Sequence, residues 1–206
     1  MSHTHIAATV AGADVHVADV DAREAALREV MPAAALPRAN SSEGRQLRRW
    51  LTQLLVAERV VAVEAGNAGV TGAHAPREDE VLPDDTARLE IGSIAAATLG
   101  DPLARAMYVY VTADVDVTDA EVDDYHARNP LRFARPSRTE SGWCAATLEA
   151  PPPETARPLI VAHLRGAARR RAFRLWLDSR CAALVRLAPG YEHPGDPRQP
   201  DNTHRH

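Results

Sequence analysis

The sequence predicts a mainly α-helical fold with a small β-sheet, and three features of its 206 residues support this prediction. Aromatic residues make up only 4% of the chain and alanine dominates the apolar residues, a composition that suits closely packed helices. Two long segments carry apolar residues at spacings of three and four, as core-facing helices do. Short segments near the two ends alternate instead with the strand period of two. We therefore expect about five or six helices and a few short strands.

The N-terminal segment predicts a β-hairpin followed by a helix. Residues 6–10 alternate between two faces, and the alternation resumes at residues 15–17 after a turn at Gly12. A helix is expected over residues 22–31, because acidic residues precede it and Pro32 ends it.

The two longest helices are predicted over residues 43–65 and 156–182. Apolar residues form one stripe along each helix, and arginines dominate the opposite side. Trp50 and Leu54 lie one turn apart on the inner face of the first helix. Trp176 lies on the inner stripe of the second. We expect these three side chains to share one layer of the core.

The segments between and after the long helices predict shorter elements. Residues 68–83 are rich in glycine, proline and acidic residues, which is typical of a loop. Three helices and two strands are expected elsewhere: helices over residues 84–99, 102–111 and 119–128, and strands over residues 141–149 and 184–187.

The most specific segment is VTDAEVDDYHARNPLRFARP at residues 117–136, a capped helix followed by an Asn-Pro-x-x-Phe-x-x-Pro exit. The opening AATVAGADVHVADVDARE and the last long helix, IVAHLRGAARRRAFRLWLDSRCAALV, add the same order of elements. Together they resemble the helical chaperone module of the SurA/PrsA-type periplasmic foldases. In that family the first and last strands pair. The resemblance therefore implies a SurA-like helical domain over residues 1–188, with a sheet formed by residues 6–10 and 184–187.

The chain also departs from that family. Residues 137–153 are far too few to hold the parvulin domain that follows the exit in the foldases, so no prolyl-isomerase activity is expected. The foldases are exported, but this sequence opens without a signal-peptide pattern. It also contains no apolar run of the ~18 residues that a membrane span needs. We therefore expect a cytoplasmic protein without a membrane partner.

The resemblance implies a binding protein that holds a polypeptide client or assists a partner enzyme. Apolar grooves between helices would take up an extended or amphipathic segment. A net charge of −4 and the lack of a nucleic-acid motif argue against nucleic acid as a partner. The arginine-rich face of the last helix is accordingly expected to pair with the acidic residues of 114–124.

The Pro/His-rich tail at residues 189–206 supports an alternative, a metal-dependent enzyme or metal carrier on the same scaffold. His204 and His206 lie within chelating reach of each other on an extended chain, and His193 and Asp201 would complete a site for zinc, iron or copper. A packed structural tail and a disordered tail are the other interpretations. Four prolines lower the entropy cost of ordering, so we expect the tail to dock from Tyr191 onward.

The sequence indicates no nucleophilic catalysis. It has no lysine for a Schiff base and no GxSxG, P-loop, GxGxxG or HExxH motif. Cys144 and Cys181 are far apart and are expected to be free core residues. His126 and His163 are expected to be packed, hydrogen-bonded side chains.

Overall fold

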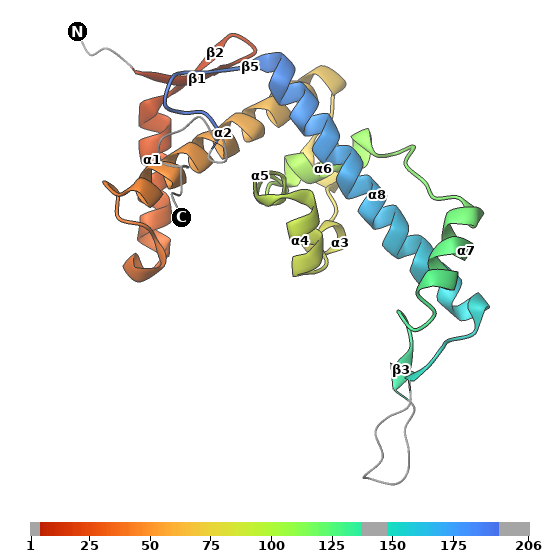
Figure 1. Ribbon diagram of the computed structural model, residues 1–206. Helices are drawn as coiled ribbons and strands as arrows, with labels where there is room; N and C mark the ends of the chain where they lie inside the picture. The colour runs from red at the N-terminus through yellow and green to blue at the C-terminus, as the bar shows by residue number, and fades with distance from the viewer. Residues whose placement is uncertain (1–4, 137–147, 194–206) are drawn as a thin grey trace.

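Two long helices, α2 (Ser42–Ala68) and α8 (Pro153–Leu184), form the frame of the molecule in the computed structural model, which describes residues 5–136 and 148–193. They meet near a small sheet that holds both ends of the described chain (Figure 1). From there α8 runs to the opposite end of the molecule, where it packs against α7 (Asp119–Arg128). The result is an arched, mainly helical structure.

The sheet joins the two ends of the chain, as the sequence predicted. Strands β1 (Ile6–Val10), β2 (Ala13–His16) and β5 (Val185–Leu187) form an antiparallel sheet in the order β2-β1-β5. Ala8 lies opposite Leu187 and Val10 opposite Val185. The mainly helical fold with a terminal sheet is therefore confirmed.

Helix α1 (Val17–Val30) begins at Val17, well before the predicted start at residue 22. The backbone N–H of His16 donates a hydrogen bond of 3.0 Å to the carboxylate of Asp19, and this contact allows the helix to start directly after β2. Ala7, Val20 and Leu51 then form a small buried cluster between the sheet, α1 and α2.

The expected helix over residues 84–99 consists of two helices, α4 (Asp85–Ile91) and α5 (Ser93–Thr98). Gly92 separates them with a φ of +89°, a conformation that L side chains rarely adopt. The expected loop before them contains a short helix, α3 (Glu78–Val81).

Two further helices follow the sequence prediction closely, whereas one short strand was not predicted. Helix α6 (Pro102–Val111) and helix α7 have the expected bounds. At the start of α7, the Glu121 carboxylate accepts the Thr118 N–H at 2.7 Å, which is the predicted capping box. Strands β3 (Arg135–Pro136) and β4 (Leu148–Glu149) pair with each other. The rest of the strand expected over residues 141–149 lies outside the described residues.

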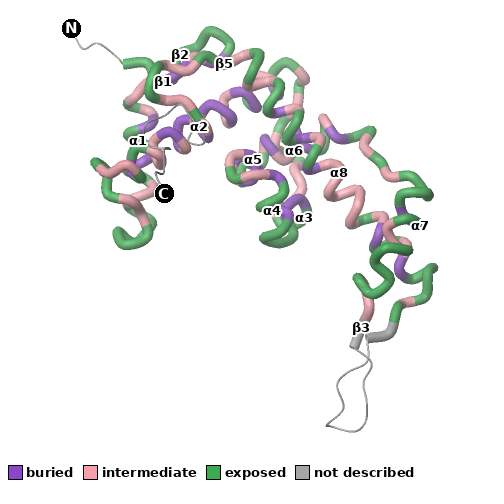
Figure 2. The backbone as a smooth tube through the Cα atoms, viewed as in Figure 1, coloured by how far each residue is buried: buried purple, intermediate pink, exposed green. Residues whose placement is uncertain are grey.

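The main core lies where α2, α4, α5, α6 and the C-terminal part of α8 meet. Phe173 is fully buried there and makes an edge-on contact with Tyr108 at a ring distance of 5.6 Å. Figure 2 shows buried segments along α2 and in the central helices, whereas the α7 end is largely exposed or half-buried. None of the described helices is long and apolar enough to cross a membrane.

The expectation that Trp50, Leu54 and Trp176 share one layer is wrong. Trp50 packs against the N-terminal cluster of Val20 and Leu51, whereas Trp176 packs against the main core beside Phe173. Helix α2 is long enough for its first part to contact α1 and for its later part to contact α8, so the two indoles are in different clusters.

Candidate functional site

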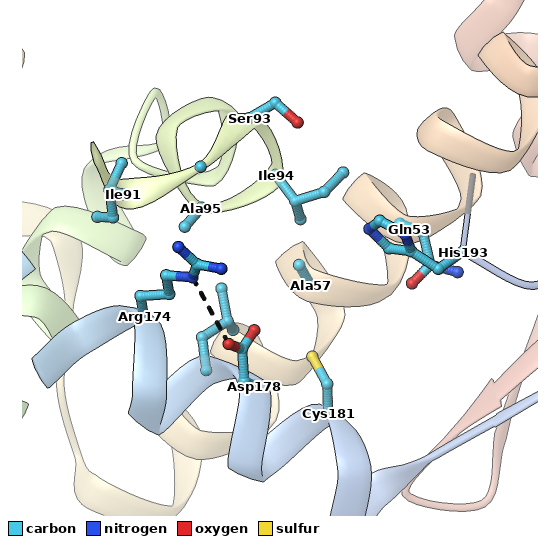
Figure 3. Close-up of a pocket in the computed structure, with 12 residues that line it drawn as sticks. Gln53, Ala57, Ile91, Ser93, Ile94, Ala95, Arg174, Asp178, Cys181 and His193 are labelled. Carbon is cyan, nitrogen blue, oxygen red and sulfur yellow. Dashed lines mark ion pairs between the residues drawn. The ribbon is translucent and has the colours of Figure 1, made fainter. Parts of the chain in front are cut away.

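A groove with a volume of about 320 Å³ opens between α2, α5 and the C-terminal part of α8 (Figure 3). We call it the α5–α8 groove. Its apolar lining consists of Ala57, Ile91, Ile94, Ala95 and Leu177. Its polar lining consists of Gln53, Ser93, Arg174, Asp178, Cys181 and His193, together with the backbone at Gly92.

The break at Gly92 shapes one wall of this groove. Ile91 ends α4 and is buried, and Ala95 in the first turn of α5 is also buried. The start of α5 is held to α2 by a hydrogen bond of 3.2 Å from Trp50 Nε1 to Ser93 Oγ. A continuous helix would lack this change of direction, because only a glycine adopts the φ of Gly92 at low cost.

The polar side chains of α8 form the opposite wall. Figure 3 shows Arg174, Asp178 and Cys181 projecting from α8 toward the α5 side and α2. Arg174 Nε lies 3.8 Å from Asp178 Oδ2, one helical turn away. A Cβ placed on Gly92 would lie 4.0 Å from Arg174 Cζ, so the guanidinium is adjacent to the break between α4 and α5.

The thiol of Cys181 lies within the groove and is half-buried. Burial and, to a lesser extent, the carboxylate of Asp178 raise the pKa of the Cys181 thiol to about 11. The group is therefore a neutral thiol at neutral pH and a poor nucleophile. Cys144 lies outside the described residues.

The first described residues of the C-terminal tail dock on α2, and the rest of the tail that the sequence predicts to dock lies outside the described residues. Tyr191 packs against the cluster around Leu51, and its carbonyl oxygen accepts a hydrogen bond of 3.1 Å from Gln53 Nε2. Two residues later, exposed His193 lines the mouth of the groove.

The predicted metal ligands cannot be placed as a set. His193 lies at the groove, but Asp201, His204 and His206 lie outside the described residues. Within residues 5–136 and 148–193, no cluster of three His, Cys, Asp or Glu side chains has the geometry of a metal site. The tail metal site stays a prediction.

The prediction that His126 and His163 are packed, hydrogen-bonded side chains is confirmed only for the packing of His163. His163 packs against Tyr125 and Phe133, with ring distances of 5.4 and 6.2 Å. Half-buried His126 differs, because its buried Nε2 has no hydrogen-bond partner among the described residues.

The expected pairing of the arginine face with acidic residues is confirmed at the α7 end. Arg157 donates hydrogen bonds to Asp119 and Asp123, and Arg165 donates to Asp116. These arginines therefore bind the protein's own carboxylates.

Sequence reasoning missed the polar lining from α2 and α5, namely Gln53 and Ser93. The available signal was Gly92, an isolated glycine inside a helical pattern, which indicates a possible helix end. The groove forms where three segments that are far apart in the sequence come together, and no local sequence pattern indicates such a contact.

The fold and the groove define a mainly helical protein with a terminal sheet and an open, partly apolar groove. A model described as "Family of unknown function (DUF7158)" matches residues 6–43, which hold the β1–β2 hairpin, α1 and the beginning of α2. No curated protein and no solved structure matches the chain. The similarity to the family model concerns the N-terminal part, and all the residues that line the groove lie beyond it.

Proposed function

We propose that this chain is a SurA-like, non-isomerase accessory protein of the cytoplasm that holds a polypeptide segment in the α5–α8 groove. The observation that carries this proposal is the combination of an apolar floor with a polar rim in one groove. Buried Ala95 and Leu177 offer apolar contacts to a side chain, while Gln53 and Ser93 offer hydrogen-bonding groups near the peptide backbone. Ligand sites in proteins commonly combine an apolar lining with a few polar groups that fix the orientation of the ligand.

The chemistry of the groove also favours binding over covalent catalysis. The neutral thiol of Cys181 is a weak nucleophile, and Arg174 and Asp178 partly neutralise each other. A groove of about 320 Å³ takes up a few side chains rather than a folded domain. The occupant we propose is therefore a short unfolded or extended stretch of a client or partner enzyme.

The test uses the full chain and reduced insulin, whose B chain unfolds and aggregates. We expect the wild type to suppress light scattering as its molar ratio to insulin rises. Ser93→Trp and Ile94→Glu narrow or charge the groove, so each should weaken suppression by at least about tenfold, equivalent to ~1.4 kcal/mol of binding. Leu159→Glu changes an apolar residue on α8 outside the groove and serves as the control.

Circular dichroism establishes that each variant keeps its helical fold before the comparison. Equal suppression by folded groove variants and by the control, or no suppression by the wild type, would contradict the proposal. A prolyl-isomerase assay run in parallel should show no acceleration of proline-limited refolding.

The second candidate is a metal-dependent enzyme or metal carrier that uses the tail. The observation in its favour is the exposed position of His193 at the groove mouth, directly before the segment that contains Asp201, His204 and His206. Neutral imidazoles bind zinc, iron or copper, so bound metal should fall below a pH of about 6. Metal analysis of the full chain and of His204→Ala/His206→Ala tests this candidate, and equal metal contents would exclude these two ligands.

A further inference from the structure

A second pocket adjoins the α5–α8 groove at Arg174. It has a volume of about 340 Å³ and is lined by Glu90 and Ala167 together with three arginines, Arg170, Arg171 and Arg174. Because Arg174 lines both hollows, the groove and the arginine-rich pocket are neighbours along α8. An extended ligand in the groove would reach this pocket along α8.

The charges of this second pocket are unbalanced. Its lining holds three guanidinium groups and one carboxylate, that of Glu90. Arg170 Nη2 donates a hydrogen bond of 3.2 Å to Glu90 Oε2. The outer cations of the pocket are Arg171 and Arg174, and Asp178 at 3.8 Å partly neutralises Arg174. A carboxylate arriving from a ligand would meet an excess of positive charge, and arginine pairs with carboxylates in a bidentate geometry.

The side chain of Arg170 is buried within the protein. It is only 7% exposed, and its buried Nε has no hydrogen-bond partner among the residues that the structure describes. Gly166 allows this position, because a Cβ there would approach Arg170 Nη1 to 3.2 Å. A buried, incompletely satisfied guanidinium costs free energy, and a bound anion close to it lowers that cost.

We propose that the groove and this pocket together bind a polypeptide segment in which an apolar side chain is followed by an acidic residue. The apolar side chain occupies the α5–α8 groove. The acidic side chain pairs with Arg171 and Arg174, close to the positive charge of Arg170. This inference rests on the proposed function and specifies the chemistry of the partner.

The surroundings favour a polypeptide over a nucleic acid. No Phe, Tyr or Trp is among the described residues that line either hollow, whereas proteins that bind single strands stack bases on aromatic rings. At the α7 end of α8, Arg157 and Arg165 are already paired with Asp119, Asp123 and Asp116. These two arginines are therefore already engaged by carboxylates, which weakens the case for a track that follows a phosphate backbone along α8.

The experiment compares two peptides with the full chain by fluorescence anisotropy at low and at high salt. Both peptides carry a neutral fluorophore and the same apolar centre, followed by two glutamates in one and by two glutamines in the other. We expect the glutamate peptide to bind more tightly by on the order of tenfold at low salt, because charge-assisted hydrogen bonds are stronger than neutral ones. High salt should reduce this preference.

Two variants locate the effect. Arg171→Gln/Arg174→Gln changes exposed side chains and should abolish the preference for glutamate. Arg171→Gln alone, which lies outside the lining of the α5–α8 groove, should weaken the preference while leaving binding of the glutamine peptide nearly unchanged. Arg132→Gln/Arg186→Gln removes the same charge from exposed positions elsewhere and should keep the preference. Glu90→Gln removes the competing carboxylate and should increase the preference.

The outcomes separate this inference from the proposed function. Equal affinity of the two peptides for the wild type would overturn the inference and leave groove binding intact. If Arg171→Gln/Arg174→Gln still binds the glutamate peptide more tightly than the glutamine peptide, the assignment of the acidic side chain to this pocket is wrong. Lack of binding by either peptide would overturn both proposals, and tighter binding of a single-stranded oligonucleotide than of the glutamate peptide would overturn the choice of partner.

Discussion

The two ends of helix α8 are stabilised in different ways. Its C-terminal part buries Phe173 and Leu177 in the main core, against helices that also form the walls of the groove. Its N-terminal part buries Ala156 and Ile160 in a small cluster with Val122 of α7. One end is therefore anchored from several sides, whereas the other depends on a single short helix.

This difference indicates that the C-terminal part of α8 belongs to the stable scaffold of the molecule, whereas the α7 end is peripheral. The groove is lined by elements that belong to the well-packed end, so we expect its shape to be set without a ligand, which would lower the entropy cost of binding. The α7 end is held by exposed ion pairs such as Arg157–Asp119 and Arg165–Asp116, which contribute little to stability. We expect local opening at the α7 end and rigidity around the groove.

The largest effect is expected for Phe173→Ala. The side chain is fully buried and contacts both Tyr108 and Trp176. Its removal leaves a cavity where α6 and α8 meet and should cost ~3–5 kcal/mol of unfolding free energy. Chemical denaturation followed by circular dichroism measures this, and a loss below about 1 kcal/mol would contradict the assignment of the main core.

A smaller and more local effect is expected for Ile160→Ala. The residue is buried, but only within the cluster that joins α7 to α8. We expect a loss of ~2–3 kcal/mol that appears as local opening of α7, because so few contacts hold this helix. Hydrogen exchange of residues Asp119–Arg128 should accelerate while the main unfolding midpoint changes little. A drop in the midpoint as large as that of Phe173→Ala would show that the two ends unfold together.

The ion pair at Glu24 should contribute less than the core side chains. Burial opposes the charge on this carboxyl, but hydrogen bonds from Arg28 and Arg48 outweigh it and hold the pKa of Glu24 below its usual range. Glu24→Gln should therefore cost ~1–3 kcal/mol at neutral pH.

Acid should remove this difference between Glu24→Gln and the wild type. A carboxyl whose pKa is lowered by folding contributes its stability above its unfolded pKa of about 4.3 and loses it as the pH falls through the lower folded value. The two proteins should therefore converge in stability as the pH falls below the unfolded pKa and through the lower folded pKa of Glu24. A gap that persists in denaturation curves at acidic pH would show that Glu24 acts through packing rather than charge.

The smallest effect is expected for Arg157→Gln at the α7 end. Asp119 and Asp123 accept hydrogen bonds from this guanidinium, but both carboxylates are exposed to water. Solvent screening leaves such pairs weak, so the unfolding free energy should stay close to that of the wild type. A clear loss of stability in the same denaturation assay would give the exposed ion pairs a larger role than the comparison assigns them.

The sequence was sufficient for the parts of the fold that depend on local patterns. The capping box at Thr118 and Glu121 marked α7, and alternation in residues 6–10 marked the strand that pairs with β5. Gly92 shows where local patterns failed, because the apolar spacing continues across a position at which the backbone turns. The early start of α1 depends on one contact between His16 and Asp19, which periodicity does not reveal.

The candidate site was less accessible from the sequence than the fold. Of the residues singled out for chemistry, His193 and Cys181 line the groove, but neither predicts it, because the groove exists only where α2, α5 and α8 meet. The arginine pocket depends on the burial of Arg170, a residue that in the sequence is one of a run of similar arginines. Burial distinguishes it from its neighbours, and burial follows from tertiary packing.

The central claim, that the α5–α8 groove holds a polypeptide segment, is tested most directly by hydrogen exchange of the full chain with and without the unfolded, reduced insulin B chain. We expect slower exchange in α5 (Ser93–Thr98) and in residues 174–181 of α8, with no change in α7. Slower exchange confined to α7 and residues 156–165, or identical exchange throughout the chain at saturating B chain, would contradict the account.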